Sequence, residues 1–336
     1  MAQTVIIVGA GASTEFSSVA ERRMPVGEGL AAMIRARLTS DLANWREDRE
    51  CPLVQALQYQ SIFNGNIHPQ AMERIRVGIV GSESIDDFVN EWEGFPGVKE
   101  VAKVAIAYSI LAAESQTDLA QLDQKVGDPT EVLAGLRNSW LGRLLRFHNA
   151  GHSMRRSFIE GMSDLAFVTF NYDRTIEWYL WNHLTRTLAV PKREARELIA
   201  RIPIIHVYGS LGLPAELGGN TPFGVFDPHR VANAAARLQT YCETIDTNHA
   251  GAIAGVIEQA KRHIFLGAAF HPQNMRLIYP LGNAEQGVEG WATVMGIGPR
   301  RKGQIREAVT NNGGTFTPFD GPAARLFQDH HDDLFD

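Results

Sequence analysis

The sequence predicts an α/β fold: a Rossmann-like parallel sheet with helices on both faces and a large helical insertion. Short apolar runs recur along the chain, and helical patterns lie between them. Alternation of this kind is typical of a parallel sheet covered by helices. The first run, Thr4 to Val8, leads into the glycine-rich turn Gly-Ala-Gly-Ala-Ser at residues 9–13. A buried strand that enters such a turn is typical of the start of a nucleotide-binding sheet.

Later apolar runs follow the pattern of the first strand. Three of them are Ala166 to Phe170, Ile204 to Val207 and His263 to Gly267. After the first of these, Thr175 to Leu188 has apolar residues about three and four positions apart, which predicts a helix. The C-terminal part continues the alternation as strand, helix and strand, over residues 291–295, 302–309 and 314–319.

Strand-like runs become rare between about residues 36 and 160. Long helical patterns dominate there, for example Val98 to Ala113 and Thr130 to His148. We interpret this region as a helical insertion in a sheet core formed by residues 1–35 and 160–336. No repeat, low-complexity tract or proline-rich linker marks a boundary, so we expect residues 1–336 to form a single domain.

Composition limits the expected partners. The chain has 32 Lys and Arg against 38 Asp and Glu, a net charge of −6, and no long basic block, so we expect no direct nucleic-acid binding. The start of the chain lacks a cationic leader, and no segment has about 18 consecutive apolar residues, so we expect no membrane association.

The cysteines and histidines argue against a metal site. Only Cys51 and Cys242 are present, far apart, which disfavours a structural zinc site and fits a reducing, cytoplasmic location. His330 and His331 lie among aspartates, but in a polar terminal segment that we expect to be solvated. We therefore expect no metal.

The glycine-rich turn suits a bound pyrophosphate. Residues without bulky side chains let the backbone approach an anion and present its N–H groups, and this singles out Gly9, Ala10, Gly11 and Ser13. Thr14 stands where the third glycine of the dinucleotide fingerprint would be, and no acidic residue clearly ends a second strand. A plain tight turn is the alternative interpretation.

Asn171 and Asp173 follow the second predicted strand directly. Open α/β sheets place ligand-binding side chains at the carboxyl ends of their strands, which predicts a binding role for both residues. The alternative is structural: Asp173 would cap the next helix while Asn171 forms the turn. We also give structural interpretations to two further groups of residues. Asp86-Asp87 is interpreted as a helix cap in the insertion, and Trp178 and Trp181 are interpreted as packing residues on a helix face.

The third and fourth strands also end in residues suited to a ligand. His206 lies in a β-branched strand, and Gly209 and Ser210 follow it in a loop where the backbone passes close to another group. A histidine is a useful acid or base at such a place, although a lone strand histidine is more often a core residue. Gly267 begins a run of small residues that suits close approach of a ribose or adenine; packing of helix on strand is the alternative.

Four elements, in this order, resemble the sirtuin-like superfamily and, more narrowly, the bacterial sirtuin-like proteins of anti-phage defence. They are Gly-Ala-Gly-Ala-Ser at 9–13, Phe-Asn-Tyr-Asp at 170–173, His-Val-Tyr-Gly-Ser at 206–210 and Phe-Leu-Gly-Ala-Ala-Phe at 265–270. The resemblance leaves the insertion unmatched. It implies NAD as substrate, with Gly9, Gly11 and Ser13 along NAD and Gly267 near its adenosine half. It also implies Asn171 at the nicotinamide ribose, Asp173 at the nicotinamide pocket and His206 as catalytic base.

Two departures from that family narrow the expected activity. The chain cannot build the four-cysteine zinc module of deacylating sirtuins, and it lacks their Pro-Asp-Phe-Arg segment after the glycine turn. We therefore expect an NAD glycohydrolase, with Asn171 and His206 as catalytic residues, that releases nicotinamide and ADP-ribose. A deacylase or ADP-ribosyltransferase, and a non-catalytic sensor or assembly subunit that binds NAD or ADP-ribose, are the alternatives.

The resemblance also implies partners. An unrestrained NADase would deplete its own cell, so we expect a homo-oligomer, or gating by a partner such as a HerA-like ring ATPase, a nuclease or a short Argonaute. The activity would then remove NAD during abortive infection.

Overall fold

Six parallel strands form the central sheet, in the order β3-β2-β1-β4-β5-β6. The computed structural model describes residues 3–82, 84–122, 129–150, 161–240, 243 and 246–335. The strands are β1 (Thr4–Val8), β2 (Leu165–Thr169), β3 (Ile204–His206), β4 (Arg262–Leu266), β5 (Glu289–Thr293) and β6 (Thr315–Phe319). This order is that of dinucleotide-binding Rossmann sheets, and the predicted α/β fold class is confirmed.

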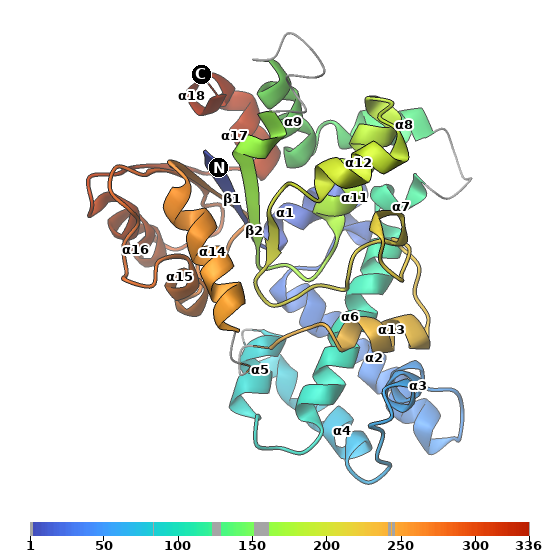
Figure 1. The fold of residues 1–336 in the computed structure, drawn as a ribbon. Helices are drawn as coiled ribbons and strands as arrows, with labels where there is room; N and C mark the ends of the chain where they lie inside the picture. Colours follow the sequence, from blue (N-terminus) through green and yellow to red (C-terminus); the bar gives the residue numbers. More distant parts are fainter. Residues whose placement is uncertain are drawn as a thin grey trace.

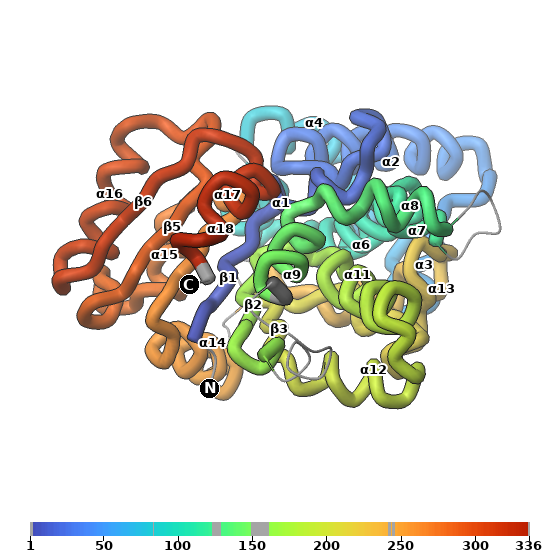
Figure 2. The backbone as a smooth tube through the Cα atoms, turned by 90° about the horizontal axis from the view of Figure 1, so that it is seen from above, coloured from blue at the N-terminus to red at the C-terminus, as the bar shows by residue number. Residues whose placement is uncertain are grey.

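The apolar runs form strands because β1 lies at the centre of the sheet and both of its faces are covered. Every residue of β1 and β2 is buried. Thr4 pairs in register with Leu165 of β2 on one side and with Arg262 of β4 on the other. Figures 1 and 2 show β5, β6, α15 and α16 on one side of β1, and β2, β3, α11 and α12 on the other.

Helices cover both faces of this sheet. Val5 and Ile7 face one core, shared with helices of the N-terminal half and with α13 to α16, and Ile6 and Val8 face a second core, shared with α9, α11, α12 and α17. The later helices are α11 (Thr175–Asn182), α12 (Lys192–Ile199), α13 (Pro228–Ala235), α14 (Thr247–Gln259), α15 (Pro272–Ile278), α16 (Pro299–Thr310), α17 (Ala323–Asp329) and α18 (His331–Phe335). The π-helical turn His183–Thr187 follows α11 directly, and together they correspond to the predicted helix 175–188.

The region between β1 and β2 is helical. After the short helix α1 (Ala10–Ser13) come α2 (Gly27–Arg46), α3 (Pro52–Tyr59), α4 (His68–Gly78), α5 (Ile85–Glu91), α6 (Val98–Gln116), α7 (Asp118–Gln121), α8 (Pro129–Leu136) and α9 (Trp140–Ala150). Figure 1 shows α2 to α6 grouped together with α13 at one end of the sheet. The last part of the predicted insertion, residues 151–160, and Cys242 lie outside the described residues.

The helical stretch predicted over 130–148 is helical but divided into two helices, α8 and α9. The break comes at Asn138-Ser139, where the Ser139 hydroxyl accepts the Gly142 N–H at 3.3 Å. This is the bond of an N-cap, and it starts a new helix. Within the described ranges, every helix is too short or too polar to span a lipid bilayer.

Candidate functional site

A cavity of about 560 Å³ opens at the carboxyl ends of the central strands. Its wall comes from the loops after β1, β2, β4 and β5 and from α2, α5 and α6. The chain leaves β1 toward β2 on one side and leaves β4 toward β5 on the other, so the cavity lies where the strand order reverses. Open α/β sheets bind ligands at this point, and the volume is in the range of small-molecule sites.

The glycine turn after β1 packs directly on the loop after β4. The Gly9 N–H donates to the Leu266 carbonyl at 2.9 Å, and the Gly11 N–H donates to the Gly267 carbonyl at 3.1 Å. A Cβ on Gly267, whose φ is +57°, would lie 2.1 Å from the Ala12 nitrogen. Gly9, Ala10, Gly11 and Gly267 all line the cavity, as predicted for ligand contacts, but two of the N–H groups expected for a pyrophosphate already have backbone partners.

Asn171 forms part of the cavity wall next to the glycine turn. Its amide nitrogen donates to the Gly9 carbonyl at 3.1 Å and to the Ser13 hydroxyl at 2.9 Å. These two bonds fix the side chain, which is 8% exposed. The carboxamide oxygen has no hydrogen bond within the described residues, so it is available to a ligand.

Asp173 lines the cavity, and a binding role for it stays a prediction. The predicted cap is wrong: α11 begins at Thr175, its N-cap residue is Arg174 without a side-chain cap, and the Asp173 Oδ1 accepts the Thr175 N–H at 3.1 Å in the turn before the helix. The Asp173 Oδ2 accepts the Ser13 hydroxyl at 2.9 Å. Burial raises the pKa of Asp173, and the hydrogen bonds from Thr175 and Ser13 counteract that rise. Ser13 itself lies behind the wall and connects Asp173 to Asn171.

His206 lies behind Asn171 and is not part of the cavity wall. Its Nδ1 donates to the Asn171 carbonyl at 2.8 Å, and its Nε2 bonds the Glu177 carboxylate at 2.7 Å. Burial disfavours the imidazolium, but the charge and hydrogen bonds of Glu177 outweigh burial, so the pKa of His206 is raised. Burial acts on Glu177 too, and His206 outweighs it, so the pKa of Glu177 is lowered. Both ring nitrogens are thus engaged, and a role as general base stays a prediction.

The loop after β3 is also separate from the cavity wall. Gly209 has a φ of +73°, and a Cβ there would lie 2.2 Å from the Arg237 carbonyl oxygen. The Ser210 hydroxyl accepts the Gly212 N–H at 3.2 Å. Both residues therefore shape the loop and its packing near the end of α13, and the structure does not bring them to the cavity with the other predicted ligand contacts.

Asp86 is a cavity residue for which the sequence suggested only a capping role. The predicted cap is wrong, because the N-cap of α5 is Ser84: its hydroxyl accepts the Asp87 N–H at 3.0 Å and donates to the Asp87 carboxylate at 2.7 Å. Asp86 instead accepts the Tyr172 hydroxyl at 2.8 Å. Burial, with a smaller contribution from Asp87, raises the pKa of Asp86 to about 7. Only one aspartate of the Asp86-Asp87 pair contacts the cap. The presence of a second aspartate was the feature of the sequence that could have indicated a site residue.

Arg23 and His271 also line the cavity and were not predicted. Arg23 is the only Lys or Arg among the described residues of the cavity wall, and its exposed side chain has no partner there. The side chain of His271, which precedes α15, likewise forms no hydrogen bond within the described part of the chain. The two side chains supply a cationic group and a titratable ring for a ligand.

Glu15 fixes two helix N-termini at the edge of the cavity. One carboxylate oxygen accepts the Trp140 N–H of α9 at 2.8 Å, and the other accepts the Ala324 N–H of α17 at 3.0 Å. Unpaired N–H groups at helix starts favour a carboxylate. Burial nevertheless raises the pKa of Glu15, and these bonds counteract the rise.

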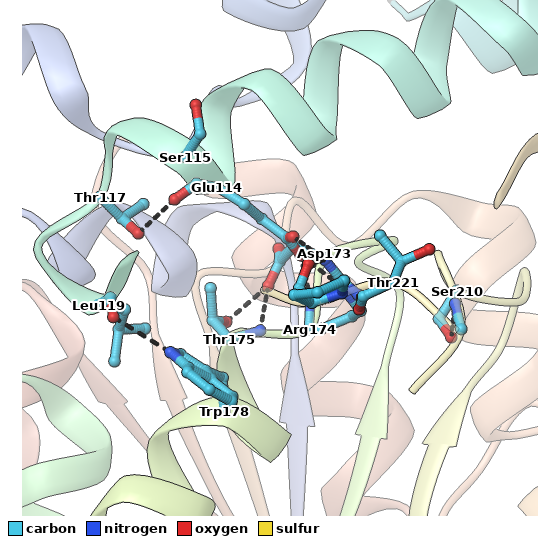
Figure 3. A network of polar contacts seen from close by, with 12 residues as sticks. Glu114, Ser115, Thr117, Leu119, Asp173, Arg174, Thr175, Trp178, Ser210 and Thr221 are labelled. Carbon is cyan, nitrogen blue, oxygen red and sulfur yellow. Dashed lines mark hydrogen bonds and ion pairs between the residues drawn. The ribbon is translucent and has the colours of Figure 1, made fainter. Parts of the chain in front are cut away.

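The segment Phe170 to Arg174 connects the sheet to the insertion. Arg174 and Glu114 of α6 are fully buried, and the Arg174 Nη2 lies 2.5 Å from a Glu114 carboxylate oxygen. Figure 3 shows Glu114 reaching down from α6 to Arg174, beside Asp173 and Thr175. Burial raises the pKa of Glu114, while the charge and hydrogen bonds of Arg174 act against that rise. The loop that carries Asn171 is therefore fixed at its far end by an ion pair.

Comparison of the chain with models of known protein families, with curated proteins and with solved structures gives no match. Among the residues that the structure describes, no group of three or more His, Cys, Asp or Glu side chains is arranged to hold a metal ion.

Proposed function

We propose that the chain binds NAD in the cavity at β1 and β4 and hydrolyses the bond between nicotinamide and ribose. The observation that carries this proposal is the position of the cavity: it opens at the strand-order reversal of a 3-2-1-4-5-6 sheet and is walled by Asn171 and the glycine turn. Dinucleotides bind at this place in Rossmann sheets.

The cavity wall supports binding of a dinucleotide in two ways. Gly9, Gly11 and Gly267 line the cavity, and their lack of a Cβ lets the turn after β1 pack directly on the backbone of the loop after β4. Arg23 lies at the wall without a partner in the described part of the chain, and a guanidinium pairs well with a phosphate. We therefore assign the pyrophosphate to the side of the cavity next to Arg23.

Hydrolysis of NAD needs little beyond positioning and charge stabilisation. The bond from C1′ to the nicotinamide nitrogen breaks, its electron pair neutralises the pyridinium, and the ribose develops oxocarbenium character until water adds. In this proposal the carboxamide oxygen of Asn171 accepts a hydrogen bond from the ribose hydroxyls and holds the sugar for attack. His206 acts as a positioning residue, because its ring donates to the carbonyl of Asn171.

We propose the further elements of this function on the family resemblance. They are a cytoplasmic location, restraint by self-assembly or by a partner protein, and depletion of NAD in anti-phage defence. Measuring the mass and the activity of the purified protein, alone and with a co-expressed neighbour, tests the restraint. A fully active monomer would remove this part of the proposal.

Chromatography of NAD incubated with wild type and with Asn171→Ala tests the activity. Free nicotinamide and ADP-ribose from the wild type, reduced about 100-fold or more in the variant, are the expected result. Asn182→Ala is the matched control, because Asn182 is a buried asparagine of α11 outside the cavity wall. Binding of NAD without turnover under any condition would favour a sensor, and transfer of ADP-ribose to protein would favour a transferase.

A further inference from the structure

We propose that Asp86, contributed by the helical insertion, accepts the proton of the attacking water in the hydrolysis proposed above. This inference rests on the proposed function and adds a catalytic residue to it. The insertion would then be part of the active site as well as a covering for both faces of the sheet.

Asp86 and Asn171 belong to one connected wall. Asp86 is the second residue of α5, and its Oδ1 accepts the hydroxyl of Tyr172, the residue that follows Asn171. The Tyr172 hydroxyl also lies 3.2 Å from the Gln239 carbonyl, which fixes it from a third segment. The carboxylate is therefore held against the loop that positions the ribose.

Asp86 is the one carboxylate of the described cavity wall that keeps an oxygen without a hydrogen bond. Both oxygens of Asp173 have partners, Ser13 and Thr175, and both oxygens of Glu15 accept backbone N–H groups. The Oδ2 of Asp86 accepts no hydrogen bond within the described residues. Among the carboxylate oxygens of the described wall, this one is therefore free to accept a hydrogen bond from a water molecule.

The surroundings of Asp86 suit proton transfer near neutral pH. The side chain is buried, with 9% of the residue exposed, and this burial raises its pKa to about 7. Asp87 on the same helix raises it further and the Tyr172 hydroxyl lowers it. The other titratable groups on the described cavity wall are Glu15, Arg23, Tyr172, Asp173 and His271. A base is most effective when its pKa lies near the working pH.

The step balances as a hydrolysis. As the bond between C1′ and the nicotinamide nitrogen breaks, its electron pair stays on nicotinamide, and a water oxygen forms the new bond to C1′. One proton of that water moves to Oδ2 of Asp86 and is then released to solvent. The products are nicotinamide, ADP-ribose and one proton, and no other reactant is consumed.

The test compares the pH–rate profile of NAD hydrolysis for wild type and for the variants Asp86→Asn, Tyr172→Phe and Asp87→Asn, with NAD affinity measured by calorimetry. Asp86→Asn should lose about 10² to 10⁴ in kcat, with affinity changed only a few-fold, and should lose the fall in rate on the acidic side. Tyr172→Phe should move that fall to higher pH, because the hydrogen bond lowers the pKa of Asp86. Asp87→Asn should move it to lower pH, because the neighbouring charge raises that pKa.

The outcomes separate the two proposals. A wild type without NAD hydrolysis, alone and with its co-expressed neighbours, overturns both the function and the role of Asp86. A hydrolysing wild type whose Asp86→Asn variant keeps the same kcat overturns the role of Asp86 alone. Unmoved profiles in Tyr172→Phe and Asp87→Asn, in an otherwise active protein, would overturn it as well.

Discussion

Replacing Glu114 by glutamine should destabilise the protein strongly, because it leaves the charge of Arg174 uncompensated in the interior. Neither side chain is exposed to solvent. The carboxylate accepts the Arg174 backbone N–H at 2.9 Å, the Nε–H at 3.2 Å and an Nη2–H at 2.5 Å, while Nη1 donates to the Thr221 carbonyl at 2.7 Å. The guanidinium is thus well bonded, and the carboxylate is the group that balances its charge.

The expected loss is about 3–5 kcal/mol in the free energy of unfolding, the usual cost of breaking a buried ion pair by removing one partner. Urea unfolding followed by circular dichroism measures it. The control is Glu197→Gln, whose partner Arg193 is 92% exposed at an N···O distance of 3.0 Å, and there the loss should stay below about 0.5 kcal/mol. The double replacement Glu114→Leu with Arg174→Met should recover part of the stability. A loss below about 1 kcal/mol in Glu114→Gln would refute the reasoning.

Three further predictions concern glycine geometry and pH. Gly267→Ala should lower the melting temperature and abolish NAD binding, because the φ of Gly267 is +57° and a Cβ there would meet the Ala12 nitrogen. The control Gly303→Ala, on the open face of α16, should instead stabilise the protein by up to about 1 kcal/mol. Glu177→Gln should cost most stability between about pH 4.5 and pH 6.5. The lowered pKa of Glu177 stabilises the fold above pH 4.5, and the raised pKa of His206 stabilises it below pH 6.5. A loss of stability that does not depend on pH would contradict the ion pair. Because Asp86 has a raised pKa, wild type should lose up to about 4 kcal/mol of stability relative to Asp86→Asn as the pH rises from 3.8 to about 7. Parallel curves of unfolding free energy against pH for the two proteins would argue against a raised pKa.

Local sequence patterns predicted helices and strands well where the secondary structure depends on one short segment alone. The β-branched run Thr4–Val8 forms a strand because both faces are buried, and the glycine turn and Asn171 reach the same cavity because parallel strands end at one edge of the sheet. The pattern over residues 130–148 predicted helical structure but not its division into α8 and α9, which comes at the cap formed by Ser139.

Contacts between distant segments decided what the sequence could not predict. Asp86 reaches the cavity through Tyr172, 86 residues away, and the partner of Arg174 lies 60 residues away. The hydrogen bonding of His206 depends on Glu177 of α11. A strand pattern that ends in a histidine therefore does not predict whether the ring nitrogens of that histidine are hydrogen-bonded. Such pairings follow from the order of strands in the sheet, and no local spacing encodes that order.

The dual role of Glu15 has a consequence for synthesis of the protein on the ribosome. Glu15 lies at the cavity and holds the start of α17, which is made 309 residues later. The strand β1 likewise waits for β4, its second neighbour, until residue 266 has been made. A nascent chain therefore has no complete cavity until residue 324 has left the ribosome, so the site is finished only after β4 and α17 have both been made.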